Sequence, residues 1–145
     1  MGSQRTDDNG RPRVVLADDH RDMLVRVAAL LASEFTVVAT VADGEALIVA
    51  EADLSPDVLV IDITMPGING LEAAALVRRR GSRVPIVFLS IHEEPEFVLA
   101  ARQAGALGYV SKVRLANDLI PAVRAALAGR RFVSAAVAVE DDEVR

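Results

Sequence analysis

The chain has 145 residues, of which 52% are hydrophobic and 26% charged, and its formal net charge is -5 at pH 7. This length fits one domain of about 100–150 residues, which can bury a core without help from a metal or a disulfide. The absence of cysteine excludes disulfide scaffolds, thiolate zinc sites and cysteine nucleophiles, and the acidic balance argues against a surface that wraps nucleic acid.

Five short stretches rich in β-branched residues predict strands, and a helical pattern follows each of them. The strands are expected at Val14–Ala17, Phe35–Thr40, Val58–Ile61, Val84–Leu89 and Gly108–Ser111. The helices, with apolar residues three and four positions apart, are expected at Met23–Ala32, Ala46–Ala52, Leu71–Arg79, Phe97–Ala104 and Leu115–Ala128. This alternation predicts an α/β fold, a doubly wound five-stranded parallel sheet flanked by helices on both faces.

Local signals mark several helix boundaries. Asp43 precedes the second helix as a cap, whereas Gly81 and Gly105 end the third and fourth helices. Pro121 falls inside the fifth helical pattern, where a proline costs stability. We therefore expect the fifth helix either to begin later or to be kinked.

The two ends of the chain are expected to lie outside the folded domain. Residues 1–11 are expected to be a disordered lead or tag, residues 12–133 the folded domain, and residues 134–145 a tail or the start of a linker. The N-terminal stretch has no apolar segment of a secretory signal, and no apolar run approaches the ~20 residues that span a bilayer. The sequence thus favours a soluble cytoplasmic protein without membrane contact.

Polar residues stand directly at the ends of four predicted strands. Asp18 and Asp19 follow the first strand, Asp62 the third, Ser90 the fourth and Lys112 the fifth. The carboxyl ends of parallel strands share one edge of the sheet, so these side chains should converge. Three carboxylates repel one another unless cations intervene; Lys112, the only lysine, supplies one charge and Mg²⁺ would supply the rest. Such a site suits phosphoryl transfer, with Asp62 as the nucleophile.

Four stretches at these strand ends resemble the receiver domain of bacterial two-component response regulators. They are Leu-Ala-Asp-Asp-His at 16–20, Val-Ile-Asp-Ile-Thr-Met-Pro-Gly-Ile-Asn-Gly at 60–70, Phe-Leu-Ser at 88–90 and Gly-Tyr-Val-Ser-Lys at 108–112. The second and fourth look most like the NarL/FixJ subgroup, and the resemblance covers about Arg13 to Phe132. It implies a flavodoxin-like receiver fold with strand order 2-1-3-4-5.

The resemblance also implies an acidic site that takes a phosphoryl group. Asp62 would accept it from a sensor histidine kinase. Asp19 and Asp62, with the backbone carbonyl of Thr64, would hold Mg²⁺, and Asp18 would assist directly or through water. The domain would then be no enzyme, but a phosphoacceptor that assists its own phosphorylation and dephosphorylation.

Three further residues take family roles around the phosphoryl group. Lys112 would reach one phosphate oxygen, and Ser90 would donate its hydroxyl to another. Tyr109 would be the switch aromatic, turning inward as Ser90 moves toward the phosphate. The bistable element would be the end of the fourth strand with the fourth helix and fifth strand.

Simpler structural explanations exist for several of these residues. Asp18 or Asp19 could cap the first helix, since aspartate is a favoured N-cap residue. Ser90 could be an ordinary hydroxyl at a strand end, and Tyr109 a half-buried strand aromatic. His20 could bind a metal or relay protons, because it follows the two aspartates, but the preferred interpretation is an exposed histidine in the first helical turn.

Two positions depart from the pattern of many relatives. Val113 follows Lys112 where proline is common, so the peptide bond between them should be trans. Ile91 follows Ser90 where a small residue is common. A branched side chain there should restrict access to the site, so we expect slow labelling by small phosphodonors and slow loss of the phosphate.

The resemblance extends to partners that lie outside this chain. Regulators of the NarL/FixJ type continue into a helix-turn-helix DNA-binding domain, so we expect a receiver fragment of a transcription factor, with a stand-alone receiver as the alternative. The receiver itself would not contact nucleic acid, and it could form a homodimer on phosphorylation. Two other functions stay open: a pseudo-receiver that binds a partner without phosphate chemistry, and an aspartyl phosphatase or flavodoxin-like carrier on a related sandwich.

Overall fold

The computed structural model describes residues 10–134, and the predicted lead and tail therefore lie almost wholly outside the described residues. Its elements are, in chain order, β1 (Arg13–Ala17), α1 (Arg21–Leu31), β2 (Thr36–Val41), α2 (Gly44–Leu54), β3 (Val58–Asp62), α3 (Gly70–Arg79), β4 (Ile86–Ser90), α4 (Pro95–Gln103), β5 (Gly108–Ser111), a 3₁₀ turn (Lys112–Arg114), α5 (Leu115–Leu127) and β6 (Phe132–Val133). The five predicted strands and five predicted helices are all present, with boundaries that differ by a few residues.

The strands form one parallel sheet in the order β2-β1-β3-β4-β5-β6. The predicted order of the first five strands is confirmed, but the count of five is wrong. β6 has two residues, too few to carry a periodic pattern. It forms because Phe132 donates its backbone N–H to the Leu107 carbonyl, and Ser134 donates to the Tyr109 carbonyl. This pairing covers the edge that β5 would otherwise expose.

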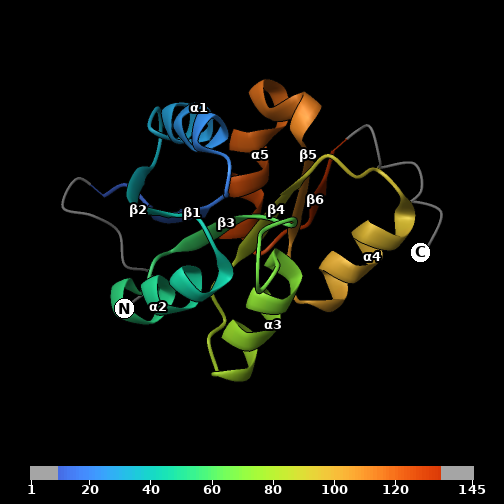
Figure 1. Ribbon diagram of the computed structural model, residues 1–145. Helices are drawn as coiled ribbons and strands as arrows, with labels where there is room; N and C mark the ends of the chain where they lie inside the picture. The colour runs from blue at the N-terminus through green and yellow to red at the C-terminus, as the bar shows by residue number, and fades with distance from the viewer. Residues whose placement is uncertain (1–9, 135–145) are drawn as a thin grey trace.

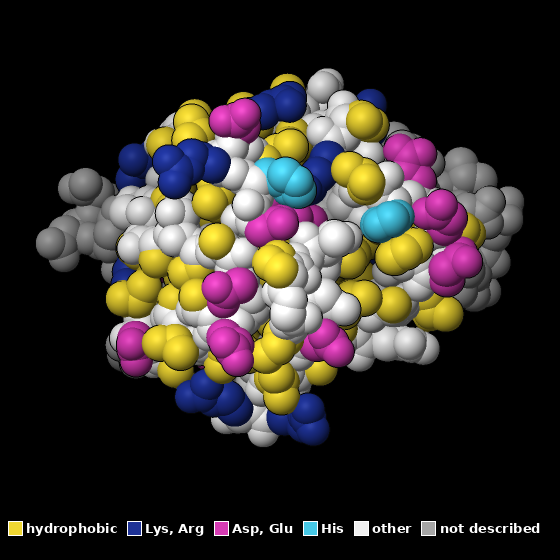
Figure 2. Space-filling view, in the orientation of Figure 1, with side chains coloured by type: hydrophobic (Ala, Val, Ile, Leu, Met, Phe, Trp, Pro, Cys, Tyr) yellow, Lys and Arg dark blue, Asp and Glu magenta, His cyan; other side chains and the backbone are white. Residues whose placement is uncertain are grey.

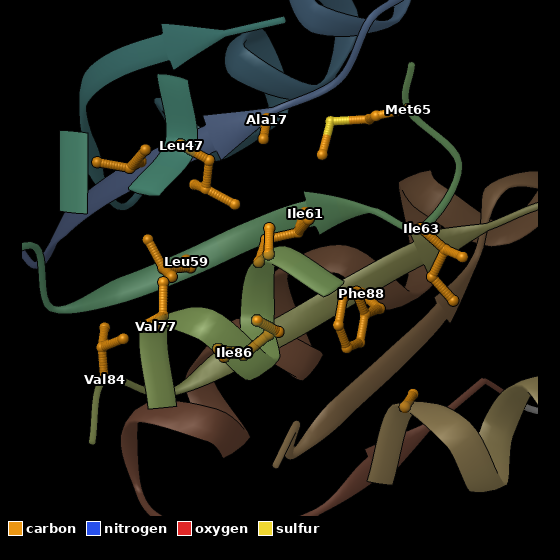
Figure 3. Packing of buried hydrophobic residues seen from close by; sticks show 14 of the residues in the cluster. Ala17, Leu47, Leu59, Ile61, Ile63, Met65, Val77, Val84, Ile86 and Phe88 are labelled. Atoms are coloured by element: carbon orange, nitrogen blue, oxygen red, sulfur yellow. The ribbon is translucent and has the colours of Figure 1, made fainter. Parts of the chain in front are cut away.

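Helices cover both faces of the sheet, as predicted: α1 and α5 lie on one face, and α2, α3 and α4 lie on the other (Figure 1). β3 and β4 are buried along their whole length, which explains their nearly continuous apolar sequences. Figure 3 shows the core on the second face, which is formed by Leu59, Ile61, Ile86 and Phe88 of the central strands together with Leu47 of α2 and Val77 of α3.

The helix boundaries follow the predicted signals with one exception. Asp43 caps α2 by accepting a hydrogen bond from the Ala46 N–H at 2.8 Å, and Gly81 and Gly105 follow α3 and α4 with φ of +93° each. The expected late start of the fifth helix is wrong, because α5 begins at Leu115 and runs through Pro121. The buried α5 residues Leu119, Ala122 and Val123 pack against the sheet on both sides of the proline, and this packing offsets its local cost.

Gly70, at the start of α3, lies directly behind the end of β3. A Cβ atom at this position would collide with the backbone carbonyl oxygen of Asp62, while the Gly70 N–H donates to the Ile63 carbonyl at 2.8 Å. Asn69 and Glu72 fix the same helix end as a reciprocal capping box. α3 is thereby anchored against the carboxyl end of β3. None of the helices within residues 10–134 is long and apolar enough to cross a membrane.

Candidate functional site

The register of the sheet brings the predicted polar residues to one edge. Ala17 pairs with Ile61, Asp62 pairs with Leu89, and Ser90 pairs with Ser111, so β1, β3, β4 and β5 end at similar heights. Asp18 comes directly after β1, and Lys112 comes directly after β5. The side chains expected to converge therefore stand at adjacent strand ends.

Lys112 joins two of the carboxylates. Its Nζ lies 3.2 Å from Asp62 Oδ2 and 3.3 Å from Asp18 Oδ2, and its side chain is only 10% exposed. Both carboxylates are buried, so these ion pairs are weakly screened by water. The compact ammonium of lysine, on its flexible stem, can lie between two carboxylates in this space. The larger planar guanidinium of arginine would fit there less well.

The Asp62 carboxyl is strongly perturbed by this setting. Burial raises its pKa from 3.8 to about 6, with the attraction of Lys112 opposing that rise and the negative charge of Asp18 adding to it. The Thr64 N–H donates to Asp62 Oδ1 at 3.3 Å. Because the charged form of this buried acid is costly, a cation at this edge would stabilise it.

Asp18 does not cap α1, so that simpler interpretation is wrong for this residue. Its Oδ1 accepts a hydrogen bond from the His20 N–H at 2.9 Å, and the N-cap of α1 is His20, whose side chain makes no capping bond. The buried Asp18 Oδ2 has no hydrogen-bond partner among the described residues, although Lys112 Nζ lies nearby. The loop before α1 thus holds one carboxylate oxygen of Asp18 inward, beside Lys112 but without a hydrogen bond.

The donor set fits a hard divalent cation. One ligand atom from each of Asp18, Asp19, His20 and Asp62 lies within 4.8 Å of the others. The unsatisfied Asp18 Oδ2 and the two further carboxylates are the oxygen ligands that Mg²⁺ prefers, and a divalent charge would relieve their mutual repulsion. Thr64, the fourth predicted metal residue, is exposed, and its backbone lies beside Asp62 through the N–H contact.

His20 is exposed, as expected, but it is the residue before the first helical turn rather than part of it. Its ring Nδ1 lies 3.3 Å from Asp19 Oδ1 and 3.5 Å from Asp18 Oδ1, with the side chain 72% exposed. Figure 2 shows two histidine side chains on one face of the molecule, each of them near acidic side chains. The imidazole therefore stands at the rim of the acidic cluster.

Ser90 and Tyr109 meet at the backbone of His92, in the loop between β4 and α4. Ser90 Oγ accepts a hydrogen bond from the His92 N–H at 2.8 Å, and the Tyr109 hydroxyl donates to the His92 carbonyl at 2.7 Å. Tyr109 is 2% exposed, so the expectation of a half-buried aromatic is wrong. Burial raises the pKa of its hydroxyl, which keeps it a donor. The sequence gives no signal for this role of His92, because the role belongs to its backbone.

Ser111 is a second residue that the sequence does not single out. Its hydroxyl donates to Glu93 Oε2 at 3.2 Å, and its backbone N–H donates to Ser134 Oγ at 2.9 Å. One residue before Lys112, it links β5 both to the β4–α4 loop and to the chain after β6. Hydroxyl residues at a strand end are common, and only the fold reveals these partners.

Ile91 and Val113 lie on the surface beside these strand ends. Their residues are 71% and 79% exposed, so little of either side chain packs on neighbours. The Lys112–Val113 bond is trans, as expected, because residues 10–134 contain no cis peptide bond. The effect of Ile91 on access to Asp62 stays a prediction.

Comparison with known proteins gives a consistent result. The family described as "Response regulator receiver domain" matches residues 14–124. The chain is similar to the response regulator GacA of Pseudomonas protegens, with 34% identity over 87% of this chain and 60% of GacA. It is also similar to the nitrate/nitrite response regulator protein NarL of Escherichia coli K12, with 35% identity over 86% of this chain and 58% of NarL.

A solved structure extends this similarity to three dimensions. It is a two-component response regulator of the LuxR family from Aurantimonas sp. SI85-9A1, with 32% identity and a TM-score of 0.87. The match covers 93% of this chain and 99% of that one. The chain spans about 60% of the length of the curated relatives that it matches.

Proposed function

The chain belongs to the response regulator receiver domain family, in its NarL/FixJ-like subgroup, and from this premise we propose that it is a phosphorylation-controlled switch with Asp62 as its phosphoacceptor. The observation that carries the proposal is the position of Lys112, whose Nζ lies within 3.3 Å of both Asp62 and Asp18. A cation held between a buried nucleophile and a second carboxylate suits the charge of a phosphoryl group in transfer.

In the proposed reaction, a carboxylate oxygen of Asp62 attacks the phosphorus of a phosphohistidine on a sensor histidine kinase. The P–O bond to Asp62 forms as the P–N bond breaks, and the electron pair of that bond returns to the kinase imidazole. Lys112 then neutralises a phosphoryl oxygen in place of the Asp62 carboxylate that it now pairs with. Phosphorylation adds negative charge at a buried edge where the raised pKa of Asp62 shows that such charge is costly, so the phosphoryl group would depend on Lys112 and a metal for stabilisation.

The residues that would hold a metal are Asp19 and Asp62, with the Thr64 carbonyl, and Asp18 directly or through water. When bound, Mg²⁺ offsets the negative charge that gathers on the phosphoryl oxygens. Asp18 Oδ2 supports this assignment, because it is buried without a hydrogen bond and shares the charge of Lys112 with Asp62. The domain is a signalling component rather than an enzyme, and we propose that it assists its own phosphorylation and dephosphorylation.

The switch would act through the His92 backbone. Ser90 Oγ, now an acceptor from the His92 N–H, would turn to donate to a phosphoryl oxygen, which breaks that bond and frees the β4–α4 loop. Tyr109 is tied to the same loop through the His92 carbonyl, so it would move with it. The signal then passes from the sheet edge to α4 and β5 by a change in hydrogen bonding.

The wider setting follows from the family and from the length of the relatives. We propose that residues 12–133 are the receiver domain, and that its output is a DNA-binding domain outside this chain, with transcription under its control. Its location would be the cytoplasm, where it would meet its kinase without itself contacting nucleic acid or membrane. A homodimer on phosphorylation is part of the same proposal, and a stand-alone receiver is the alternative output arrangement.

The experiment is an amide NMR titration, first with Mg²⁺ and then with beryllofluoride, which mimics a phosphoryl group on an aspartate. We expect Mg²⁺ to shift resonances around Asp19 and Asp62, and beryllofluoride to move Ser90, His92, Tyr109 and α4. Asp62→Asn is the matched control and should abolish the second response. A spectrum that neither addition changes would refute the switch and favour a pseudo-receiver that binds its partner without phosphate chemistry.

A further inference from the structure

The imidazole of His20 has no part in the proposed phosphoryl transfer, yet it stands among the carboxylates that would hold the metal. We propose that His20 is an additional ligand of that cation and gives the site a preference for nitrogen-binding divalent metals, such as Co²⁺, Ni²⁺ and Zn²⁺. This inference rests on the proposed function in so far as both use the same metal position.

The distances between donor atoms are those of ligands that share one ion. His20 Nδ1 lies 3.3 Å from Asp19 Oδ1 and 3.5 Å from Asp18 Oδ1. Neighbouring ligands of an octahedral ion with bonds of about 2.1 Å are about 3 Å apart, and opposite ligands about 4.2 Å apart. The whole set lies within 4.8 Å, so small side-chain movements suffice to close it around one cation.

The backbone of His20 also positions one of the carboxylates of this cluster. Asp18 is fully buried and its Oδ1 accepts from the His20 N–H, while its Oδ2 has no hydrogen bond within residues 10–134 and lies 3.3 Å from Lys112 Nζ. The hydrogen bond from the His20 backbone thus fixes the Asp18 carboxylate with its second oxygen toward Lys112. The same residue places its own imidazole on the side of the two carboxylates, so backbone and side chain of His20 shape one site together.

The charges favour a divalent ion. Asp18, Asp19 and Asp62 carry three negative charges when ionised, and Lys112 offsets one of them, which leaves a deficit equal to the charge of one divalent cation. Oxygen ligands alone suit Mg²⁺, whereas an imidazole adds little to Mg²⁺ affinity and much to that of later transition metals. Replacing one oxygen ligand or water by His20 should therefore change selectivity more than it changes Mg²⁺ binding.

The chain offers a matched control, because it contains two histidines. His92 is exposed to a lesser degree, stacks on Phe97 and lies 3.8 Å from Glu94, outside the acidic cluster. His20→Ala, His20→Asn and His92→Ala would be compared with the unaltered chain. Asn is a favoured N-cap residue, so His20→Asn protects the start of α1 and separates loss of a ligand from loss of the helix end.

Two measurements test the proposal on the whole chain. Calorimetric titration gives affinities for Co²⁺ and Mg²⁺, and proton NMR of the Co²⁺ form gives the hyperfine-shifted imidazole N–H resonance of a coordinated histidine. We expect both His20 variants to lose at least about tenfold in Co²⁺ affinity and to lack that resonance, with Mg²⁺ affinity within about twofold. His92→Ala should keep both, and excess Mg²⁺ should displace the Co²⁺.

The outcomes separate this inference from the proposed function. If the shifted resonance persists in His20→Asn, or if Co²⁺ affinity is equal in all the chains, His20 is not a ligand and the inference fails. The response of Asp62 to Mg²⁺ and beryllofluoride would then stand unaffected. If instead Co²⁺ binds through His20 but beryllofluoride changes nothing, the metal site is real and the proposed phosphoryl switch fails.

Discussion

Replacing Asp62 by asparagine should change how the stability of the domain depends on pH. The folded-state pKa of Asp62 is about 6, raised by burial above the value of 3.8 for an unperturbed aspartate. Between these values the native state binds more protons than the unfolded state, so the free energy of unfolding falls as the pH rises. The contribution of the protonated Asp62 carboxyl to the free energy of unfolding is present at low pH and is lost as the pH rises through about 6.

The size of the effect follows from the shift. One pKa unit corresponds to about 1.4 kcal/mol, and a rise from 3.8 to about 6 therefore gives about 3 kcal/mol. Asparagine has nearly the same shape but does not ionise. The unfolding free energy of Asp62→Asn minus that of the unaltered chain should therefore increase by about 2 to 3 kcal/mol from pH 4 to pH 7.5, because part of the effect lies below pH 4.

The assay is urea denaturation followed by circular dichroism, in steps of half a pH unit, in buffer with a chelator. Taking the difference between the two chains cancels the titration of groups that both contain. The same series with 10 mM Mg²⁺, a concentration chosen on the order of that needed to fill a carboxylate site, should flatten the pH dependence, because a cation favours the charged form of Asp62.

Two results would refute this reasoning. If the difference in unfolding free energy between the two chains stays constant from pH 4 to pH 7.5, the Asp62 carboxyl titrates at its ordinary pKa. The effect of burial on that pKa would then be offset by the attraction of Lys112. A difference that shrinks as the pH rises would mean that Lys112 outweighs burial, which would place the folded-state pKa below 3.8 instead of above it.

The remaining predictions concern the surroundings of this carboxylate. Ser134→Ala should cost about 1–3 kcal/mol in urea denaturation, because the buried Ser111 N–H loses its acceptor; a cost near zero would mean that the Ser111 N–H does not depend on this hydroxyl. Gly70→Ala should lower the melting temperature by several degrees, since its Cβ meets a backbone carbonyl of β3, and an unchanged value would contradict that contact. Lys112→Met should tighten Mg²⁺ binding in calorimetry by removing a positive charge, yet abolish the NMR response to beryllofluoride. Ile91→Ala should accelerate both labelling by acetyl phosphate and loss of the label, and equal rates on phosphate-affinity gels would discard the idea of a barrier.

Much of the fold is determined by the sequence, because its signals are local and repeated. The apolar runs of β3 and β4, the helical spacing between strands, and boundary residues such as Asp43 and Gly81 act within a few residues. Parallel strands then have to end on one edge, so a carboxylate at residue 62 and a lysine at residue 112 could be placed near each other without coordinates. The family resemblance added the order of the strands and the roles of the residues.

Only the tertiary structure decided the features that depend on distant partners. β6 exists because β5 offers it a hydrogen-bonding edge, and α5 continues through Pro121 because its apolar face is packed on the sheet. Asp18 could have capped α1, but its burial and the His20 N–H fix it toward Lys112 instead.

The electrostatics of the site also depend on residues that are distant in the sequence. The raised pKa of Asp62 is a property of its buried surroundings, and the meeting of Ser90 and Tyr109 at His92 runs through backbone atoms that every residue shares. Residue types and spacing therefore determined which groups gather at the sheet edge. Burial and hydrogen-bond geometry, which sum over segments far apart in the chain, decided what each group can do there.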